Sequence, residues 1–596
     1  MPNLDWSRLG SWPGGTVQGI ALSPHFERDR LALAATGAGL FRSADGGVTW
    51  QRAGEMGYIA IRCAAFAPSG AAFAATQAGA LMHSTDGGVR WQALNAWAFG
   101  PINALALPPS QNGEATIFAA TDEGIFRSMD GGASWQSANF GLLDVEILCL
   151  ACAPDFAESE VVWAGSANGG LYRSRNAGRA WREAGHGLPD AAVQCIIVAE
   201  SGVLAGTESG LFRLANGATW LPYGLPGLEV NDLIVCNDTL LAGTTQGVFR
   251  NEGEKWQATE VQEPTLALAG MANGVILVGS VREGIWRSAD GGRTWQIAHE
   301  GLAAHTPPLA VRACSGAFLL ADAVGSIAFS EDGVAWRPVA TGNPIACMAA
   351  SPPGRRCTTV AATKANVLGW DADAEDLSLW TSQPALADED AITALFLTRD
   401  GTCLVGTQAG QCKVGSAGTP WHDVALPGEG IVAALHLTPA GSLFALRLAP
   451  KHVADSDSFS AALWRLPTLV LPATKDAPWQ MLLALDSLRV PLACLSVEGN
   501  RIIVAAQHVV AQTRMTEGDP IELRRIAFEA GATFIAIATR SAETFLASNR
   551  GVVRLSDTGA HQPVGKALAG VPVVAISADE EGLWAVTLGG EVWRHP

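Results

Sequence analysis

Residues with the types and spacing of a catalytic or metal centre are scarce in this chain. Cys149 and Cys152 have the spacing of a redox pair, but on a strand their odd separation turns the two side chains to opposite faces. The histidines form no metal-ligand pattern such as H-E-x-x-H, and no Gly-Lys-Ser/Thr phosphate loop occurs. We therefore predict no catalytic residue, no metal site and no cofactor.

Polar residues on a family of short turns are the remaining candidates for binding or chemistry. The frame T-x-x-G recurs around these turns while the residues inside it vary, as at Thr121 to Gly124. Variable loops on a constant frame are typical of a binding scaffold, and solvated turn residues are the alternative interpretation. The candidate binding residues on the turns are Asp122, Glu123, Asn168, Glu208, Gln246, Arg282 and Glu283, and corresponding turns follow at 364–366 and 549–550.

Longer segments between the apolar runs add aromatic candidates. Trp97 lies in the segment from Asn95 to Asn103, and Tyr223 opens the segment from Tyr223 to Asp232. Such side chains could anchor a peptide or stack on a sugar, or they could pack their own loop. Residues 449–479, rich in Asp, Ser and Pro, lengthen one repeat and are interpreted as an elongated loop, either a partner-binding arm or a disordered one.

The elements that carry these candidates repeat along the chain. The segment 31–50 reads "LALAATGAGLFRSADGGVTW", and the segment 116–135 reads "TIFAATDEGIFRSMDGGASW". The mean period is roughly 43 residues, which lies in the range of propeller blades. Each repeat contains four short apolar runs between Gly-containing turns, and none of these runs has the length and period of a helix.

The number of repeats predicts the domain organisation. Fourteen repeats can be followed through the chain, the later ones weaker. A single ring of that size would leave a centre that side chains could not fill. The predicted fold is all-β, with two tandem seven-bladed β-propellers of four-stranded antiparallel blades, at residues 1–298 and 299–596. A strand at residues 4–10 is expected to seal one ring, either the first ring or, by crossing over, the last blade of the second.

A motif at the end of the repeat resembles a known family. Good matches to the pattern Ser-x-Asp-x-Gly-x-Thr-Trp lie at 43–50, 84–91, 128–135 and 288–295. It resembles the Asp-box, or BNR repeat, of propellers in sialidases, sortilin-type receptors, xyloglucanase-type glycoside hydrolases and photosystem assembly factors. The Asp side chain can accept backbone N–H groups of its own turn, and the Trp can cover apolar surface between blades. The residues with these expected structural roles are Asp45, Trp50, Asp86, Trp91, Asp130, Trp135, Asp290 and Trp295.

Composition restricts the partners. The chain has 596 residues and a net charge of -18, so its overall field would repel nucleic acid. It has no long uncharged apolar stretch and no signal peptide at the start, and its eleven cysteines follow no disulfide pattern. We expect no membrane insertion and a cytoplasmic location, and the oligomeric state stays open.

The function predicted from these features is non-catalytic. We expect a scaffold or interaction protein that binds a protein or peptide on its propeller faces or between the rings, within a multi-component assembly. The alternative is a glycoside hydrolase or carbohydrate-binding protein of the xyloglucanase-like tandem type. That resemblance implies an acid in a Thr-Asp-x-Gly-Gly element of the first blade, where this chain has Thr36-Gly37-Ala38-Gly39, so Asp122 is the best remaining carboxylate.

Overall fold

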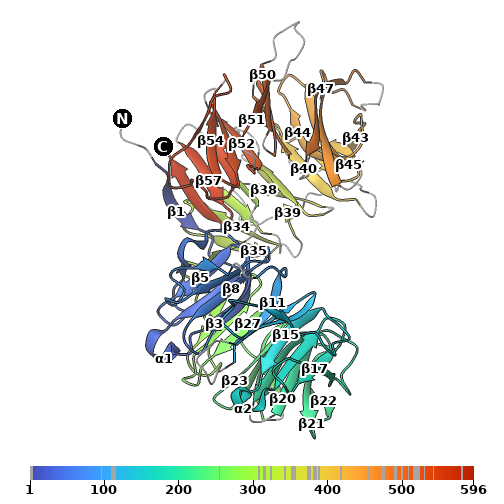
Figure 1. Cartoon of the computed structure of the whole chain (residues 1–596). Coiled ribbons are helices and arrows are strands. Elements are labelled where there is room, and N and C mark those ends of the chain that lie inside the picture. The colour runs from blue at the N-terminus through green and yellow to red at the C-terminus, as the bar shows by residue number, and fades with distance from the viewer. Residues whose placement is uncertain are drawn as a thin grey trace. The chain divides into compact units, whose positions relative to one another are not determined.

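The computed structural model shows an all-β chain built from four-stranded antiparallel sheets, as predicted (Figure 1). The structure describes residues 5–596 except for 95–96, 109–115, 200–201, 254, 306–308, 313–316, 323–324, 341–343, 351–357, 365, 372–377, 380–385, 387–389, 417–418, 454–455, 472–476, 489–492, 499–500, 508, 515–523, 529–530, 541–542, 557 and 579–581. Within this part of the chain, no helix is long and apolar enough to cross a membrane.

The chain divides into two compact units. The N-terminal unit is Pro13–Thr306, and the C-terminal unit combines Met1–Trp12 with Pro307–Pro596. These units differ at both edges from the expected ranges 1–298 and 299–596. The first twelve residues belong with the C-terminal half of the chain, because they supply a strand to its last sheet.

Each sheet of the N-terminal unit consists of four strands that are consecutive in the chain. The sheets are β3 (Val17–Leu22), β4 (Ala32–Thr36), β5 (Gly39–Ser43) and β6 (Gln51–Arg52); β7 (Ile61–Phe66), β8 (Ala72–Thr76), β9 (Leu81–Ser84) and β10 (Gln92–Ala93); β11 (Ile102–Ala106), β12 (Ile117–Thr121), β13 (Gly124–Ser128) and β14 (Gln136–Ser137); β15 (Ile147–Cys152), β16 (Val162–Ser166), β17 (Leu171–Ser174) and β18 (Arg182–Glu183); β19 (Val193–Ala199), β20 (Gly202–Thr207), β21 (Gly210–Ala215) and β22 (Thr219–Gly224); β23 (Val230–Cys236), β24 (Thr239–Thr244), β25 (Gly247–Glu252) and β26 (Lys255–Ala258); β27 (Thr265–Gly270), β28 (Ile276–Ser280), β29 (Ile285–Ser288) and β30 (Gln296–Ile297).

The first strands of these sheets contact one another in a closed circuit. β3 contacts β7, the contacts continue through β11, β15, β19 and β23 to β27, and β27 contacts β3. This arrangement of sheets around an axis is that of a β-propeller. The second strands β4, β8 and β12 are buried along their whole length and rich in Ala, so adjacent sheets can pack closely.

Short elements outside the sheets complete the N-terminal unit. β2 (Gly14–Gly15) pairs in parallel with β31 (Ala303–Ala304). The one-turn helices α1 (Phe26–Asp29) and α2 (Phe156–Ser159) connect a first strand to a second strand, and a 3-10 helix spans Gly54–Met56. These elements were not predicted, because each spans only about one turn and is too short for a helical period to show in the sequence.

The C-terminal unit has the same four-stranded sheets. They are β32 (Leu309–Arg312), β33 (Phe318–Ala321), β34 (Ser326–Ser330) and β35 (Arg337–Ala340); β36 (Cys347–Ala350), β37 (Thr358–Ala362), β38 (Val367–Asp371) and β39 (Ser378–Leu379); β40 (Ile392–Leu397), β41 (Cys403–Thr407), β42 (Cys412–Gly415) and β43 (His422–Val424); β44 (Ile431–Leu437), β45 (Leu443–Val453), β46 (Ser456–Leu466) and β47 (Gln480–Leu488); β48 (Ala493–Glu498), β49 (Arg501–Ala506), β50 (Val509–Arg514) and β51 (Arg524–Ala527); β52 (Phe534–Arg540), β53 (Glu543–Ser548), β54 (Gly551–Leu555) and β55 (His561–Pro563); β56 (Val573–Ala578), β57 (Leu583–Thr587), β58 (Glu591–His595) and β1 (Ser7–Ser11). The contacts between first strands again close, from β32 through β36, β40, β44, β48 and β52 to β56 and back to β32.

The N-terminal strand completes the last sheet of the C-terminal unit. β1 pairs antiparallel with β58, from Ser7 opposite Arg594 to Ser11 opposite Glu591 (Figure 1). β30 stays in its own sheet beside β29, so the alternative in which the N-terminal strand completes the first ring is wrong. The pairing covers an edge of β58 that would otherwise expose its backbone groups.

Residues 449–453 and 456–466 of the insertion at 449–479 extend a hairpin, so its interpretation as an elongated loop is wrong there, whereas the described residues 467–471 and 477–479 lie outside the strands. β45 and β46 have eleven residues each. Their ladder runs from Leu443 opposite Leu466 to Val453 opposite Ser456. Residues 454–455 and 472–476 of this insertion lie outside the described residues.

The repeated Asp closes the turn between the third and fourth strands. In the first sheet, Oδ1 of Asp45 accepts the backbone N–H of Val48 at 3.0 Å, and Oδ2 accepts the Thr49 hydroxyl at 2.6 Å. Burial raises the pKa of Asp45, but these hydrogen bonds outweigh it and hold the pKa below its ordinary value. Gly47 has a φ of 84°, and a Cβ there would lie 2.5 Å from Cδ2 of Leu277 in the last sheet.

The Trp that follows this turn joins neighbouring sheets in part of the repeats. In these repeats the indole Nε1 donates to a carbonyl just after the fourth strand of the preceding sheet. The pairs are Trp50 with Ala298 at 2.9 Å, Trp181 with Ala138 at 2.7 Å, Trp220 with Ala184 at 2.7 Å and, in the C-terminal unit, Trp6 with Val564 at 2.6 Å. Trp91 and Trp135 donate instead to Gly88 and Gly132 of their own turns. We call the first group the clamp tryptophans.

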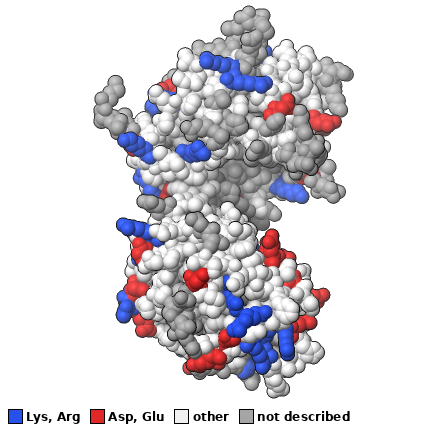
Figure 2. Space-filling view, in the orientation of Figure 1, with Lys and Arg blue, Asp and Glu red and all other residues white. Residues whose placement is uncertain are grey.

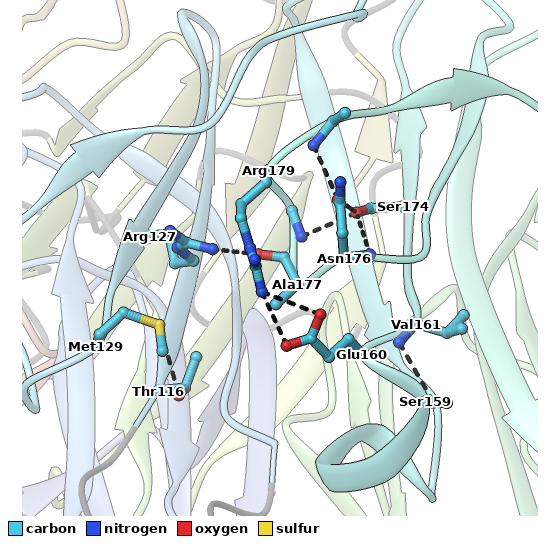
Figure 3. Close-up of polar contacts among 12 residues, drawn as sticks. Thr116, Arg127, Met129, Ser159, Glu160, Val161, Ser174, Asn176, Ala177 and Arg179 are labelled. Carbon is cyan, nitrogen blue, oxygen red and sulfur yellow. Dashed lines mark hydrogen bonds and ion pairs between the residues drawn. The ribbon is translucent and has the colours of Figure 1, made fainter.

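An Arg in the third strand forms a second link between sheets. Arg127 of β13 donates to the carbonyl oxygen of Ala177, in the turn of the next sheet, at 2.6 Å (Figure 3). Arg42 reaches Gly87 in the same way, and Arg287 of the last sheet reaches Gly46 of the first. These bonds satisfy backbone carbonyls that the turns leave unpaired.

Candidate functional site

The candidate turns that begin at Thr121, Thr207 and Thr244 share one hydrogen-bonded frame. The Thr121 hydroxyl donates to the Gly124 carbonyl at 2.9 Å and accepts the N–H of Glu123 at 3.1 Å. The hydroxyls of Thr207 and Thr244 donate to the third residue after them in the same way. These hydrogen bonds fix the backbone of each turn. The side chains of the two residues between the Thr and the Gly can therefore vary.

These turns lie at the end of each sheet where the first strand begins. The N–H of Glu208 donates to the Ala192 carbonyl, and Ala192 immediately precedes β19. Thr245 donates to Glu229 before β23, and the corresponding bonds occur before β15 and β27. We call the turn tips at 122–123, 167–168, 208–209, 245–246 and 282–283 the turn face. It shares one end of the unit with the connections between sheets.

Two carboxylates at this end of the unit, Asp122 of the turn face and Asp144 before β15, accept hydrogen bonds from amides. Nδ2 of Asn103 donates to Oδ1 of Asp122 at 2.7 Å and to the carbonyl of Ile147 in the next sheet at 2.8 Å. Asn168 donates its backbone N–H and its Nδ2 to Oδ2 of Asp144, at 3.1 and 3.2 Å. Burial raises the pKa of Asp144, but hydrogen bonds from Ser166, Glu146 and Asn168 outweigh it and lower the pKa. Asp122 and Asn168 therefore lie on neighbouring turns, each with its own partner.

Other predicted residues are exposed without side-chain hydrogen bonds among the described atoms. Glu123, Glu208 and Gln246 are exposed, and only their backbone N–H groups are held by the turn. Their side chains are available for contact with another molecule. Figure 2 shows both acidic and basic side chains on the surface of the N-terminal unit.

The last turn of the turn face, at 282–283, is held by an ion pair and by contacts with both ends of the unit. Arg282 forms an ion pair with Glu263 at 3.1 Å. Burial, together with the charge of Glu263, raises the pKa of Glu283. The Glu283 carbonyl lies 2.6 Å from Nδ1 of His299, and Thr16 donates to the neighbouring Val281 carbonyl. Arg282 and Glu283 therefore help to hold the ends of the unit together.

The two aromatic candidates differ in burial. Trp97 is only 7% exposed, packs edge-on against Phe99 and Trp135, and donates to Gly100. Its ring is used in packing, in agreement with the alternative that it packs its own loop. Tyr223 lies at the end of β22, is partly exposed, and faces the guanidinium of Arg213 at 5.5 Å from its ring centroid. Tyr223 is therefore the more accessible of the two.

Sequence reasoning missed Asp232, a carboxylate in the first strand β23. Its oxygens accept the N–H of Leu233 at 2.8 Å and of Leu268, in the next sheet, at 2.7 Å. Burial raises the pKa of Asp232 to about 6. Each first strand of the unit has a register shift at this level, and the residues after the other shifts are Gly19, Cys63, Ala104, Cys149, Cys195 and Ala267. The other repeats have a small uncharged residue at this position, so the single Asp in the sequence could have identified Asp232 as a candidate.

The raised pKa of Asp232 predicts a pH-dependent contribution to stability. Because the folded-state pKa of about 6 exceeds the ordinary value of 3.8, the folded protein binds more protons between these pH values, and stability falls as the pH rises through that window. Asp232→Asn lacks this loss. The difference in the free energy of unfolding, variant minus wild type, is therefore expected to rise by about 2–3 kcal/mol from pH 4 to pH 7.5. Urea unfolding at both pH values measures this change. A constant difference between the two proteins would contradict it.

Cys149 and Cys152, which have the spacing of a redox pair, are a buried and a partly buried thiol. The cysteines that the structure describes are free thiols, and burial raises the pKa of Cys149 and of Cys152 to about 12, so neither is a thiolate near neutral pH. Among the described residues, no three His, Cys, Asp or Glu side chains gather as metal ligands would. The arrangement of the turn face is suited to binding through exposed polar side chains on a rigid frame.

No protein-family model matches the chain, and no curated protein matches it. Its fold is similar to that of solved tandem propellers. The GH74 xyloglucanase from Xanthomonas campestris aligns over 99% of each chain with a TM-score of 0.70 and 17% identity. The GH74 enzyme of Niastella koreensis aligns over 99% of each chain with a TM-score of 0.69 and 14% identity. PorZ, a surface component of the type-IX secretion system of Porphyromonas gingivalis, aligns over 99% of this chain and 86% of its own, with a TM-score of 0.57 and 12% identity. At such identities the likeness concerns the fold.

Proposed function

We propose that this protein is a non-catalytic scaffold whose turn face binds a protein or peptide partner. The observation that carries the proposal is the set of exposed side chains Glu123, Glu208 and Gln246, held on turns whose backbones are fixed by Thr hydroxyls. A rigid frame lowers the entropic cost of binding, because the turns need not be ordered when the partner arrives.

The fold that supports this proposal is a pair of seven-bladed rings with Asp-box turns. The two closed circuits of first strands and the β1–β58 pairing support this blade count. The hydrogen bonds of Asp45 and its counterparts support the Asp-box assignment. In the N-terminal unit the clamp tryptophans Trp50, Trp181 and Trp220 link neighbouring sheets, so partner binding at the turn face need not disturb the sheets.

Charge suggests the chemistry of the partner. The net charge is -18, and the exposed candidate tips carry carboxylates at positions 123 and 208. Such a surface attracts a segment that carries Lys or Arg and repels nucleic acid. The free thiols of the described cysteines are consistent with a reducing compartment, so we place the protein and its partner in the cytoplasm as part of this proposal.

A glycoside hydrolase is the second candidate, favoured by the fold similarity to GH74 enzymes along nearly the whole chain. Three observations argue against it. The turn at Thr36–Gly39 has no carboxylate, and the exposed Asp122 carboxylate already accepts a hydrogen bond from the Asn103 amide. Asp232 has a raised pKa, but both of its oxygens accept backbone N–H groups.

Incubation with xyloglucan oligosaccharides tests the hydrolase alternative. We expect no release of reducing sugar by the wild type, and no difference between the wild type and Asp122→Ala. Sugar release that Asp122→Ala abolishes would contradict the non-catalytic proposal. A thermal unfolding curve of Asp122→Ala serves as the control for an intact fold.

Charge reversal on the turn face tests partner binding directly. The variant Glu123→Lys/Glu208→Lys/Gln246→Lys is expected to lose a partner that the wild type captures from an extract of its native cells. The matched control Glu158→Lys/Glu183→Lys/Gln257→Lys changes the net charge equally at exposed positions on α2, β18 and β26, and should keep the partner. Equal capture by both variants would place the binding surface elsewhere.

A further inference from the structure

The connection between β14 and β15 carries exposed apolar side chains at the end of the N-terminal unit where the turn face lies. Leu143 is 81% exposed and Phe140 is 78% exposed, the largest exposed fractions among the large apolar side chains of the described residues. Val145, on the same connection, is 44% exposed. The Cα atoms of Phe140 and Leu143 are at most about 11 Å apart, because three peptide steps of about 3.8 Å separate them. We call Phe140, Leu143 and Val145 the apolar patch.

The backbone of this connection is held by the neighbouring sheet, so the apolar patch has a fixed place on the surface. The Phe140 carbonyl accepts the N–H of Trp181 at 2.8 Å, and the N–H of Asp144 donates to the Tyr172 hydroxyl at 2.9 Å. Leu142 packs against the core cluster between the sheets β11–β14 and β15–β18. Leu142 therefore supplies the apolar contact that anchors the connection, and the side chains of the apolar patch are left on the outside.

Two other connections that meet a clamp tryptophan show which residue types stand at the position of Phe140. Trp50 donates its backbone N–H to the Glu300 carbonyl at 2.8 Å. Trp220 donates its backbone N–H to the His186 carbonyl at 2.9 Å. Glu300 and His186 are exposed polar residues. Folding of these connections thus requires no apolar side chain at this position, and an exposed ring beside a second exposed apolar side chain is typical of an interaction site.

The apolar patch lies between two turns of the turn face. On one side, Nδ2 of Asn139, the residue before Phe140, donates to the Glu123 carbonyl at 3.1 Å. On the other side, Asp144 accepts hydrogen bonds from the backbone N–H and the side-chain amide of Asn168. A partner that contacts these turns therefore reaches the apolar patch as well.

The surroundings of the apolar patch are acidic. Four carboxylates stand beside it, and none of them belongs to an ion pair between described residues. The exposed Arg182 of β18, directly after Trp181, adds one positive charge to this region, so the sum stays negative. The four carboxylates are those of Asp122, Glu123, Asp144 and Glu146.

We propose that the apolar patch binds a large apolar side chain from a protein segment that carries Lys or Arg on both sides of it. This inference rests on the proposed function, because it names the class of segment that the turn face binds. The apolar side chain covers Phe140 and Leu143 and so removes apolar surface from water. The flanking cations face the four carboxylates.

Two other occupants fit the apolar patch less well. A second copy of this chain, bound about a two-fold axis, would bring the same four carboxylates against one another. A sugar presents hydroxyl groups, to which the aliphatic side chains of Leu143 and Val145 offer no hydrogen bond. A basic segment with an apolar side chain matches both the charge and the apolar surface.

Binding to a peptide array tests the proposal. Each peptide has a central pair of residues, varied over all residue types, between flanks that are Lys in one set and Glu in the other. We expect the protein to bind Lys-flanked peptides with a large apolar central pair such as Leu-Trp. It should bind neither their Glu-flanked counterparts nor the Lys-flanked Ser-Ser peptide. Binding to no peptide, or binding that does not depend on the central pair, would overturn the proposal.

Fluorescence anisotropy with the Lys-flanked Leu-Trp peptide assigns the binding to the apolar patch. Phe140→Ser/Leu143→Ser is expected to weaken binding at least about tenfold, because the apolar contact is lost. The matched control Val48→Ser/Val89→Ser removes exposed apolar side chains from turns at the opposite end of the unit and should bind like the wild type. Thermal unfolding of both variants checks the fold. Equal affinity of the wild type and folded Phe140→Ser/Leu143→Ser would contradict the assignment.

Capture from the extract of native cells separates this inference from the proposed function. If Phe140→Ser/Leu143→Ser keeps the partner that Glu123→Lys/Glu208→Lys/Gln246→Lys loses, the turn face binds a partner but the apolar patch has no part in it. If both variants keep the partner, the proposed function fails together with this inference.

The other occupants have their own readouts. A dimer of the wild type in analytical ultracentrifugation that Phe140→Ser/Leu143→Ser abolishes would assign the apolar patch to a second copy. Binding of xyloglucan oligosaccharides that the same variant loses would assign it to a sugar. Either result would overturn the proposal.

Discussion

Replacing Trp50 with Ala is expected to lower the free energy of unfolding of the N-terminal unit by about 3–5 kcal/mol. Trp50 is only 2% exposed and belongs to the core cluster between the first and last sheets. Its loss leaves a cavity and removes the indole donor from the Ala298 carbonyl at the point where the circuit of sheets closes. Equilibrium unfolding in urea, followed by tryptophan fluorescence and circular dichroism, measures the loss.

Trp91→Ala is the matched control for this prediction. Trp91 ends the same eight-residue motif, but it is partly exposed and its indole bonds to Gly88 of its own turn at 3.1 Å. We expect a clearly smaller loss of stability than for Trp50→Ala, because less surface is buried and no link to another sheet is broken. Equal losses in the two variants would show that the hydrogen bond from Trp50 to the Ala298 carbonyl does not contribute to stability.

Deletion of residues 1–12 is expected to destabilise the C-terminal unit most strongly. The deletion removes β1 from the edge of β58 and, with it, the buried rings of Trp6 and Trp12. Loss of a buried Trp costs about 3–5 kcal/mol, and the freed edge of β58 becomes a site for aggregation. Differential scanning calorimetry should show a lower unfolding temperature, and light scattering should show association that the full chain lacks.

Two substitutions serve as controls for the loss of β1 as a whole. Trp6→Ala keeps β1 but removes the bond of its indole to the Val564 carbonyl, and should give a smaller shift in the same direction. Ser7→Ala changes an exposed residue and should leave the unfolding temperature nearly unchanged. An unchanged unfolding temperature after deletion of residues 1–12 would contradict the role of β1 in closing the sheet.

The repeated sequence predicted the four-stranded antiparallel sheets well, because strand signals are local. Runs such as 32–36, with apolar residues between Gly-containing turns, became fully buried strands. The pairing of β1 with β58 could only be left as one of two alternatives, because it joins residues at opposite ends of the chain. The hairpin of β45 and β46 was missed because its Asp, Ser and Pro residues resemble a loop.

The side-chain roles were harder to predict than the strands. Trp50 and Trp91 end the same motif, yet their indoles bond to different partners. The chain segments beside the two indoles also differ: a 3-10 helix at Gly54–Met56 follows the sheet before Trp91, whereas Ala298 follows the sheet before Trp50 and accepts its indole N–H. Asp232 was missed because its burial comes from the next sheet, through the N–H of Leu268, and not from its own strand.

Site-specific photocrosslinking tests the central claim, that the turn face binds a partner, most directly. A photoreactive residue is placed at Glu208 on the turn face or at Glu183 on the outer strand β18, both exposed. After irradiation in native cells, we predict a discrete adduct of higher mass from position 208 and none from position 183. The adduct from position 208 should disappear when Glu123 and Gln246 are changed to Lys. Adducts from position 183 alone, or from neither position, would contradict the account.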